Sequence, residues 1–218
     1  MLNVFFLILY LIFSVIHLYG SAKKNDKIRN ITKPLLMPTL ACFYICSVPV
    51  INWYVLALII TSWLGDVFLM IHGMKWFTIG GVSFLCTHIL LIYLYLQNIT
   101  WSLQSVTVFV LYAIIGSGIV ASEYVRLIRY MPKSNAAALL TYLCCNIVMN
   151  MFAALQAVSN LNEGSGLILL GALLFLMSDS LLYLVRFDKK LPFYGQHFNV
   201  MLTYTLAKLL IVIGFIFA

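Results

Sequence analysis

Charged side chains are scarce in this sequence, at 9% of the 218 residues, whereas 64% of the residues are hydrophobic. An ordinary soluble domain is about one quarter charged, so this chain has too few ionisable groups to cover a water-exposed surface. The apolar excess must face lipid, which excludes a water-soluble enzyme or binding module. The 13 basic residues outnumber the 6 acidic ones. Because they lie mostly in short loops between apolar runs, they indicate membrane topology and not a nucleic-acid partner.

Cysteine is also sparse and forms no ligand pattern. The 5 cysteines are odd in number, all lie within apolar runs, and their spacing matches no zinc motif. We expect them to pack as small hydrophobic side chains. The sequence therefore predicts no metal and no other cofactor.

The apolar runs have the length of membrane spans. A crossing helix takes about 20 apolar residues, so the chain has room for roughly eight spans with short loops and for no soluble domain. We therefore expect an all-α, polytopic membrane bundle of about eight transmembrane helices that forms a single integral-membrane domain over residues 1–218. The expected spans are residues 2–20, 33–50, 52–72, 76–97, 101–124, 134–157, 163–186 and 193–217.

Positive charge alternates between the loops of this arrangement. Lys and Arg occur in the segments 21–33, 126–133 and 186–190 and at Lys75, while the loops between them contain neither residue. Cytoplasmic loops carry such an excess, so we expect the basic loops in the cytoplasm and both termini on the non-cytoplasmic side. In a bacterium the chain would lie in the inner membrane.

Two aspartates fall inside the expected spans. At about 1.5 Å of rise per residue, Asp66 lies roughly 9 Å and Asp179 roughly 11 Å from the cytoplasmic ends of their helices. An ionisable group near the bilayer centre costs at least about 2.5 kcal/mol and tends to mark function. Two carboxylates at one depth on two helices indicate a functional pair nearer the cytoplasmic face. Structural pairing of the two helices is the simpler alternative.

Other polar side chains recur at helical spacing. Ser62 lies one turn before Asp66 and Tyr183 one turn after Asp179, so each could donate a hydrogen bond to its carboxylate. Lys208 is too deep to reach water easily and needs a carboxylate or an anionic ligand. Interhelical hydrogen bonding could explain any single stripe of polar residues, but several stripes predict a polar cavity open toward the cytoplasm. The stripes are His197, Met201, Tyr204 and Lys208 in the last span, Tyr142, Asn146 and Asn150 in the sixth, and Tyr10, Ser14 and His17 in the first.

The segments SWLGDVFLM at residues 62–70 and GALLFLMSD at residues 171–179 contain the two aspartates. They resemble the paired signatures of the YhhN family, the integral-membrane lysoplasmalogenases. The likeness continues elsewhere, at Lys33-Pro34-Leu35, from Gly80 to Phe84 with His88, at Tyr142 with Met149, and at Tyr204. Where the resemblance leads us to expect a glutamine four residues after Tyr204, this chain has Lys208. By its mid-span position, His88 is expected to be an ordinary packed histidine.

The resemblance implies hydrolysis of the vinyl-ether bond of alkenyl-glycerophosphocholine or -ethanolamine lysolipids, which gives a fatty aldehyde and a glycerophospho-alcohol. The substrate would be a lipid from the bilayer. That chemistry needs an acid to protonate the β-carbon and a second group to orient water, and two neighbouring buried carboxylates can share one proton and supply both. Which aspartate is the acid stays open. The candidate site has Asp66 and Asp179 as catalytic residues, and Lys33, Ser62, Tyr142, Asn146, Ser178, Tyr183, His197, Tyr204 and Lys208 as supporting or substrate-binding residues.

Two other classes of membrane protein use buried aspartates. A proton- or cation-coupled transporter would use them as a relay, but such proteins often have repeated halves and helices broken by Gly or Pro. Here no repeat is evident, and the prolines lie at or near span ends, with Pro38 the deepest. An intramembrane aspartyl protease is the second alternative, because Leu64-Gly65-Asp66 approaches a Gly-x-Gly-Asp signature. Residue 63, however, is Trp, and the sequence has no Pro-Ala-Leu motif.

Overall fold

The computed structural model describes residues 1–187 and 196–218, which form eight α-helices and one short 3-10 turn without any strand. The all-α prediction is confirmed, and seven of these helices are long and apolar enough to cross a membrane. Lys189, Lys190 and the expected start of the last span at residue 193 lie outside the described residues. The helices are α1 (Leu2–Ala22), α2 (Asp26–Ser47), α3 (Trp53–Met70), α4 (Met74–Leu96), α5 (Leu103–Leu127), α6 (Ala136–Ser159), α7 (Glu163–Phe187) and α8 (Gln196–Phe217), and the 3-10 turn is η1 (Lys133–Asn135).

Helix α2 differs most from its predicted span. It begins at Asp26 instead of residue 33, so most of the expected basic loop is helical. The side chain of Asn25 caps this start by accepting hydrogen bonds from the backbone N–H groups of Lys27 and Ile28. Hydropathy marks where the apolar run begins and misses a helix that starts in a polar segment. Helix α2 is not among the seven apolar helices.

Two prolines lie in the interior of α2, and not near a helix end as expected. Pro38 has no N–H to donate to the carbonyl of Pro34, one turn earlier. The indole Nε1 of Trp63 donates to that carbonyl instead, at 3.0 Å. This hydrogen bond joins α2 to α3, and its donor Trp63 lies close to Asp66 in the sequence.

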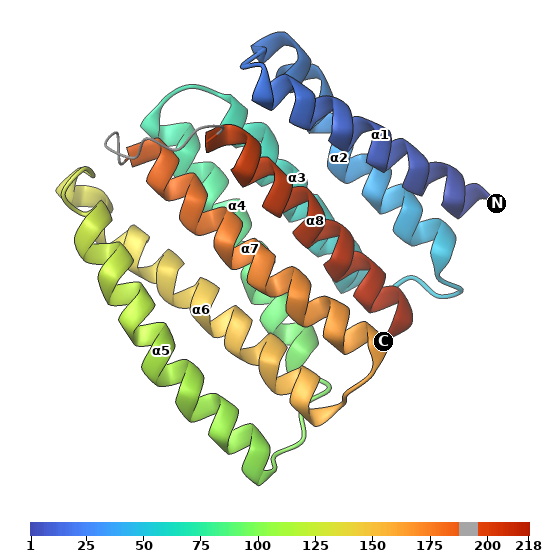
Figure 1. The fold of residues 1–218 in the computed structure, drawn as a ribbon, viewed down its shortest axis with the longest axis vertical. Coiled ribbons are helices and arrows are strands. Elements are labelled where there is room, and N and C mark those ends of the chain that lie inside the picture. The colour runs from blue at the N-terminus through green and yellow to red at the C-terminus, as the bar shows by residue number, and fades with distance from the viewer. Residues whose placement is uncertain (188–195) are drawn as a thin grey trace.

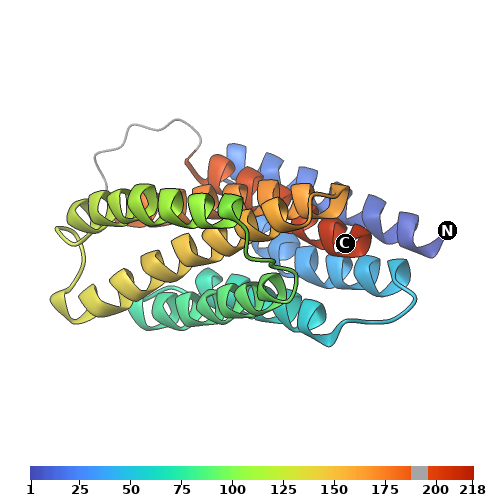
Figure 2. The same cartoon turned by 90° about the horizontal axis from the view of Figure 1, so that it is seen from below.

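The helices pack as neighbouring pairs along the chain: α1 with α2, α3 with α4, α5 with α6, and α7 with α8 (Figure 1). Helices α3 and α4 lie behind α7 and α8, as the two views together show (Figures 1 and 2). Helices α7 and α8 approach closely because Gly171 has no side chain; a Cβ there would be 3.0 Å from the carbonyl oxygen of Ala207. The N- and C-termini lie at the same end of the bundle (Figure 1).

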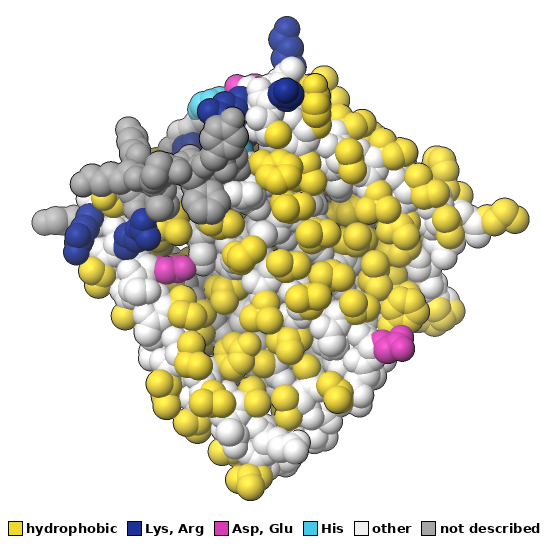
Figure 3. Space-filling model, in the orientation of Figure 1, with side chains coloured by type: hydrophobic (Ala, Val, Ile, Leu, Met, Phe, Trp, Pro, Cys, Tyr) yellow, Lys and Arg dark blue, Asp and Glu magenta, His cyan; other side chains and the backbone are white. Residues whose placement is uncertain are grey.

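Basic side chains gather at the opposite end. On the face shown in Figure 3, Lys and Arg lie around the junction of α1 with α2 and over the end of α5 near its turn into α6, while hydrophobic side chains are spread over the rest of the face. This distribution fits a bundle whose sides contact lipid and whose basic end meets the headgroups. The orientation of the termini across the membrane stays a prediction.

Candidate active site

A cavity of about 580 Å³ lies inside the basic end of the bundle. Six helices supply its lining: α1, α2, α3, α4, α7 and α8. Both Asp66 and Asp179 line it, although they are far apart in the sequence. The other sequence-predicted residues in its lining are Lys33, Ser178, His197 and Tyr204.

Asp66 joins three helices in this cavity. The hydroxyl of Tyr204, on α8, donates a hydrogen bond to its Oδ2 at 2.6 Å. The ammonium of Lys33, on α2, lies 3.4 Å from its Oδ1. Each oxygen of this carboxylate, which is only 2% exposed, therefore has its own donor.

Asp179 has a different set of neighbours, and they all contact one oxygen. Its Oδ2 accepts hydrogen bonds from the hydroxyl of Tyr142 at 2.7 Å and from the amide Nδ2 of Asn146 at 3.0 Å. His88 Nε2 lies 3.3 Å from the same oxygen, within ion-pair distance but without hydrogen-bond alignment. None of the described residues donates a hydrogen bond to Oδ1.

No hydrogen bond joins the two carboxylates within residues 1–187 and 196–218. Each aspartate thus has separate donors, and the sharing of one proton by the pair stays a prediction. Asp66 pairs with an ammonium and a phenol. Asp179 pairs with a phenol and an amide, next to an imidazole.

Two of the expected partners do not contact the aspartates. The hydroxyl of Ser62 donates to the backbone carbonyl of Leu58 at 2.7 Å, as serines inside helices commonly do. The ring of Tyr183 packs 5.2 Å from that of Tyr142, but Tyr183 has no hydrogen bond to Asp179 in the described structure. Helical spacing placed both residues on the correct face, but could not show that the donors to Asp179 come from α6.

Lys208 is 2% exposed and lacks both a hydrogen-bond acceptor and a carboxylate within ion-pair distance in the described part of the chain. The structure thus gives Lys208 no carboxylate partner among the described residues, and the expected alternative, an anionic ligand, stays a prediction. Three aromatic rings surround the ammonium instead, with centroids at 3.6 Å for Phe175, 5.5 Å for Tyr204 and 5.8 Å for Phe84. Such contacts stabilise a desolvated cation by about 2 kcal/mol or more. His88 stacks on Phe175 as well, at 4.9 Å.

The outer part of the cavity is basic. Arg29 and Arg186 line it together with His17, the exposed His197 and one acidic residue, Asp26, which pairs with Arg29 at 2.9 Å. The hydroxyl of Thr32 donates to a backbone carbonyl and lies 2.8 Å from His17 Nδ1, so that nitrogen donates and Nε2 is left without a partner. The guanidinium groups of Arg29 and Arg186 suit an anionic ligand.

Ser178 has a structural contact. Its hydroxyl donates to the backbone carbonyl of Val200 at 3.2 Å and so joins α7 to α8 beside Asp179.

No group of three or more His, Cys, Asp or Glu side chains in the described residues is arranged to hold a metal ion.

Comparison with known proteins identifies one family. The model of the YhhN family matches residues 28–215 of this chain. Neither the curated proteins nor the solved structures include a significant match. Because the family match covers most of the chain, the chain belongs to the YhhN family.

Proposed function

We propose that this member of the YhhN family is an intramembrane hydrolase that cleaves the vinyl-ether bond of alkenyl-glycerophosphocholine or -ethanolamine lysolipids, with Asp66 and Asp179 as its acid–base pair. The observation that best supports this function is that two buried aspartates from different helices line one cavity whose outer part is basic. The family likeness of the two aspartate segments is consistent with it.

The contacts favour Asp179 as the proton donor and Asp66 as the base. All donors around Asp179 bind Oδ2, so a proton on Oδ1 would be free to reach a substrate in the cavity. Asp66 instead has an ammonium at Oδ1 and a phenol at Oδ2, which leaves no oxygen without a donor. This is the pattern of an ionised carboxylate, since a protonated one would compete with those donors for its own oxygens.

The reaction can be written with these two residues alone. Asp179 transfers its proton to the β-carbon of the vinyl ether, whose π electrons form the new C–H bond, and an oxocarbenium ion results. Water adds to the α-carbon of that ion and gives its proton to Asp66, which produces a hemiacetal. The hemiacetal C–O bond then breaks: its hydroxyl proton returns to Asp179, and Asp66 protonates the departing glycerol oxygen. The fatty aldehyde and the glycerophospho-alcohol leave, and both carboxyl groups are restored.

The basic outer part of the cavity would hold the phosphate. Arg29 on α2, which also pairs with the exposed Asp26, and Arg186 on α7 both line this region, and guanidinium groups suit bidentate binding of phosphate oxygens. Lys33 lies deeper, at Asp66. A phosphate in the outer part would therefore place the glycerol and the ether bond between the two aspartates. If the basic loops are cytoplasmic, this site is near the cytoplasmic face.

The test is aldehyde release by Asp66→Asn and Asp179→Asn in membranes, compared with Ser62→Ala. Ser62 lies one turn from Asp66, but its hydroxyl hydrogen-bonds to the Leu58 carbonyl and the Thr87 hydroxyl and not to either aspartate. Each Asp variant is expected to lose activity by about 100-fold or more, the scale of general acid–base catalysis, while Ser62→Ala stays near wild type. Near-normal aldehyde release by either Asp variant would refute the pair. Cleavage of peptides, or proton flux without lipid turnover, would instead support a protease or a transporter.

A further inference from the structure

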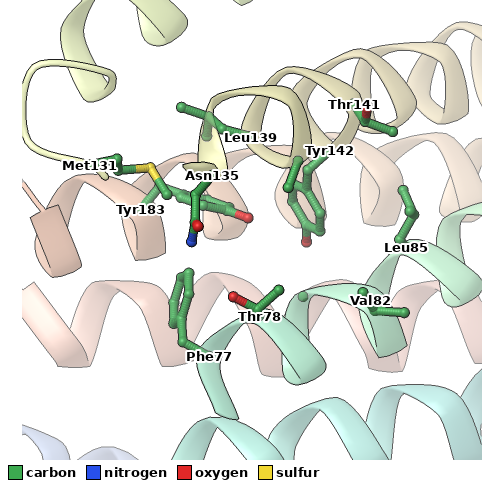
Figure 4. Close-up of a pocket in the computed structure, with 12 residues that line it drawn as sticks. Phe77, Thr78, Val82, Leu85, Met131, Asn135, Leu139, Thr141, Tyr142 and Tyr183 are labelled. Carbon is green, nitrogen blue, oxygen red and sulfur yellow. The ribbon is translucent and has the colours of Figure 1, made fainter. Parts of the chain in front are cut away.

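A second hollow, of about 160 Å³, lies next to the main cavity, between α4 and α6 and against α7. We call it the α4–α6 cleft. Figure 4 shows side chains of α6 facing those of α4 across it, with Tyr142 and Tyr183 at its inner side. Its lining is largely apolar, and it consists of Phe77, Thr78, Gly81, Val82, Leu85, Met131, Asn135, Ala138, Leu139, Thr141, Tyr142 and Tyr183.

The inner end of the cleft meets the catalytic cavity. Phe77 lines both hollows. Tyr142 lines the cleft, and its hydroxyl binds Asp179 Oδ2 at 2.7 Å. One side chain therefore separates the cleft from the carboxyl group that we assign as the proton donor.

The outer rim of the cleft lies on the side of the bundle. Thr78 and Val82 on α4 and Ala138 and Thr141 on α6 all line the cleft and are exposed. Both helices are among those apolar enough to span the membrane, so we expect this rim to face lipid. The cleft thus leads from the exposed side of α4 and α6 to Tyr142, whose hydroxyl binds Asp179.

We propose that the α4–α6 cleft binds the hydrocarbon chain of the substrate directly beyond the ether double bond. This inference rests on the proposed function. Pockets for whole ligands usually measure about 300–1,000 Å³, so the smaller cleft suits part of one chain that continues into the bilayer. The phosphate would lie in the main cavity, and the lipid would enter sideways between α4 and α6.

This orientation of the lipid also agrees with the roles proposed for the two aspartates. In a vinyl ether the β-carbon lies on the chain side of the ether oxygen. A chain that runs through the cleft therefore brings the β-carbon to Asp179, whereas the ether oxygen and the glycerol extend toward Asp66. The assignment of Asp179 as proton donor came from its hydrogen bonds, and the position of the cleft next to Tyr142 is consistent with it.

Gly81 offers a way to fill the cleft. A Cβ at this position would lie 3.9 Å from the Tyr183 hydroxyl, an ordinary contact, so a larger side chain can project into the cleft without a clash at its base. The matched control is Gly118→Leu on α5, because a Cβ at the exposed Gly118 meets no atom within 4 Å. Both substitutions place leucine in an apolar helix, and only Gly81→Leu occupies the cleft.

The measurement is kcat/KM for two alkenyl lysolipids with one headgroup, an octadecenyl and a butenyl ether. Gly81→Leu is expected to lower kcat/KM for the octadecenyl substrate about tenfold or more, because overpacking excludes the chain, and to change the butenyl value less than about threefold. Gly118→Leu should match wild type with both. Equal losses for the two substrates, or none, would overturn the proposal. The ratio between substrates also corrects for any loss of folded protein.

A binding measurement separates this inference from the proposed function. A non-hydrolysable alkyl-ether lysolipid with a diazirine near the ether should photolabel α4 and α6 residues of the cleft in wild type, and much less in Gly81→Leu. Aldehyde release together with labelling elsewhere would refute the cleft but keep the hydrolase. Labelling in the cleft without aldehyde release from any vinyl ether would refute the hydrolase and keep a binding site for a lipid chain.

Discussion

The hydrogen bond between Tyr142 and Asp179 gives the sharpest test of the proposed site. Tyr142→Phe removes one hydroxyl from a buried position and leaves the ring in place. That hydroxyl donates to Asp179 Oδ2 at 2.7 Å, where it would stabilise the carboxylate formed when the proton leaves. Hydrogen bonds to charged groups contribute about 1.5–3 kcal/mol, so kcat/KM for vinyl-ether hydrolysis should fall about 10- to 100-fold.

Tyr183→Phe is the matched control for this prediction. Its ring lies 5.2 Å from that of Tyr142 and also lines the α4–α6 cleft, yet its hydroxyl has no hydrogen bond to Asp179 among the described residues. We expect its kcat/KM to stay within about threefold of wild type, as for substitutions that break no specific interaction. The assay is aldehyde release by purified protein, with the thermal midpoint of each variant measured in parallel. Equal losses in the two variants, or a Tyr142→Phe enzyme as active as wild type, would refute the role assigned to this bond.

Two further predictions concern the lysines. Lys33→Met removes the ammonium 3.4 Å from Asp66 Oδ1 and leaves a buried carboxylate with one donor, so kcat/KM should fall about tenfold or more and the thermal midpoint should drop; an unchanged rate and midpoint would contradict the ion pair. Lys208→Met removes a buried ammonium. Burying that charge costs several kcal/mol, whereas its contact with the ring of Phe175 stabilises it by about 2 kcal/mol, so the variant should be more stable than wild type by about 1–3 kcal/mol. A lower thermal midpoint in detergent would show that Lys208 has an ionic role in the fold.

The helices were predictable because the bilayer fixes their length. Helix α3, at Trp53–Met70, matches the expected span 52–72, and α7, at Glu163–Phe187, matches 163–186. The same logic failed for α2, whose first turns are polar and are stabilised by the Asn25 cap. A hydropathy signal reports which residues lie in lipid, and a helix that extends into the headgroup region begins before that signal does.

The contacts of the site were less predictable than its location. The spacing of Ser62 and Tyr183 indicated donors on the same helices as the aspartates, whereas the donors to Asp179 belong to another helix. Spacing along one helix shows which side chains share a face, but the register of the helix packed against it depends on the whole bundle. His88 illustrates the same limit, since a lone histidine in an apolar run gave no sign that it approaches Asp179 to 3.3 Å.

The position of Lys208 bears on how the proposed reaction manages charge. An oxocarbenium ion between the aspartates would form in the same buried region as this ammonium, and like charges repel strongly where water is excluded. Phe175 lies 3.6 Å from the ammonium and Tyr204 at 5.5 Å, so aromatic rings, and not a carboxylate, stabilise the lysine. Asp66 therefore pairs with one cation among the described residues, Lys33 at 3.4 Å, and Lys208 is not a second counter-ion within ion-pair distance. A direct Lys208–Asp66 ion pair would add a second cation to that carboxylate and weaken its attraction for the proposed oxocarbenium ion, whereas the rings of Phe175 and Tyr204 hold the ammonium without using a carboxylate.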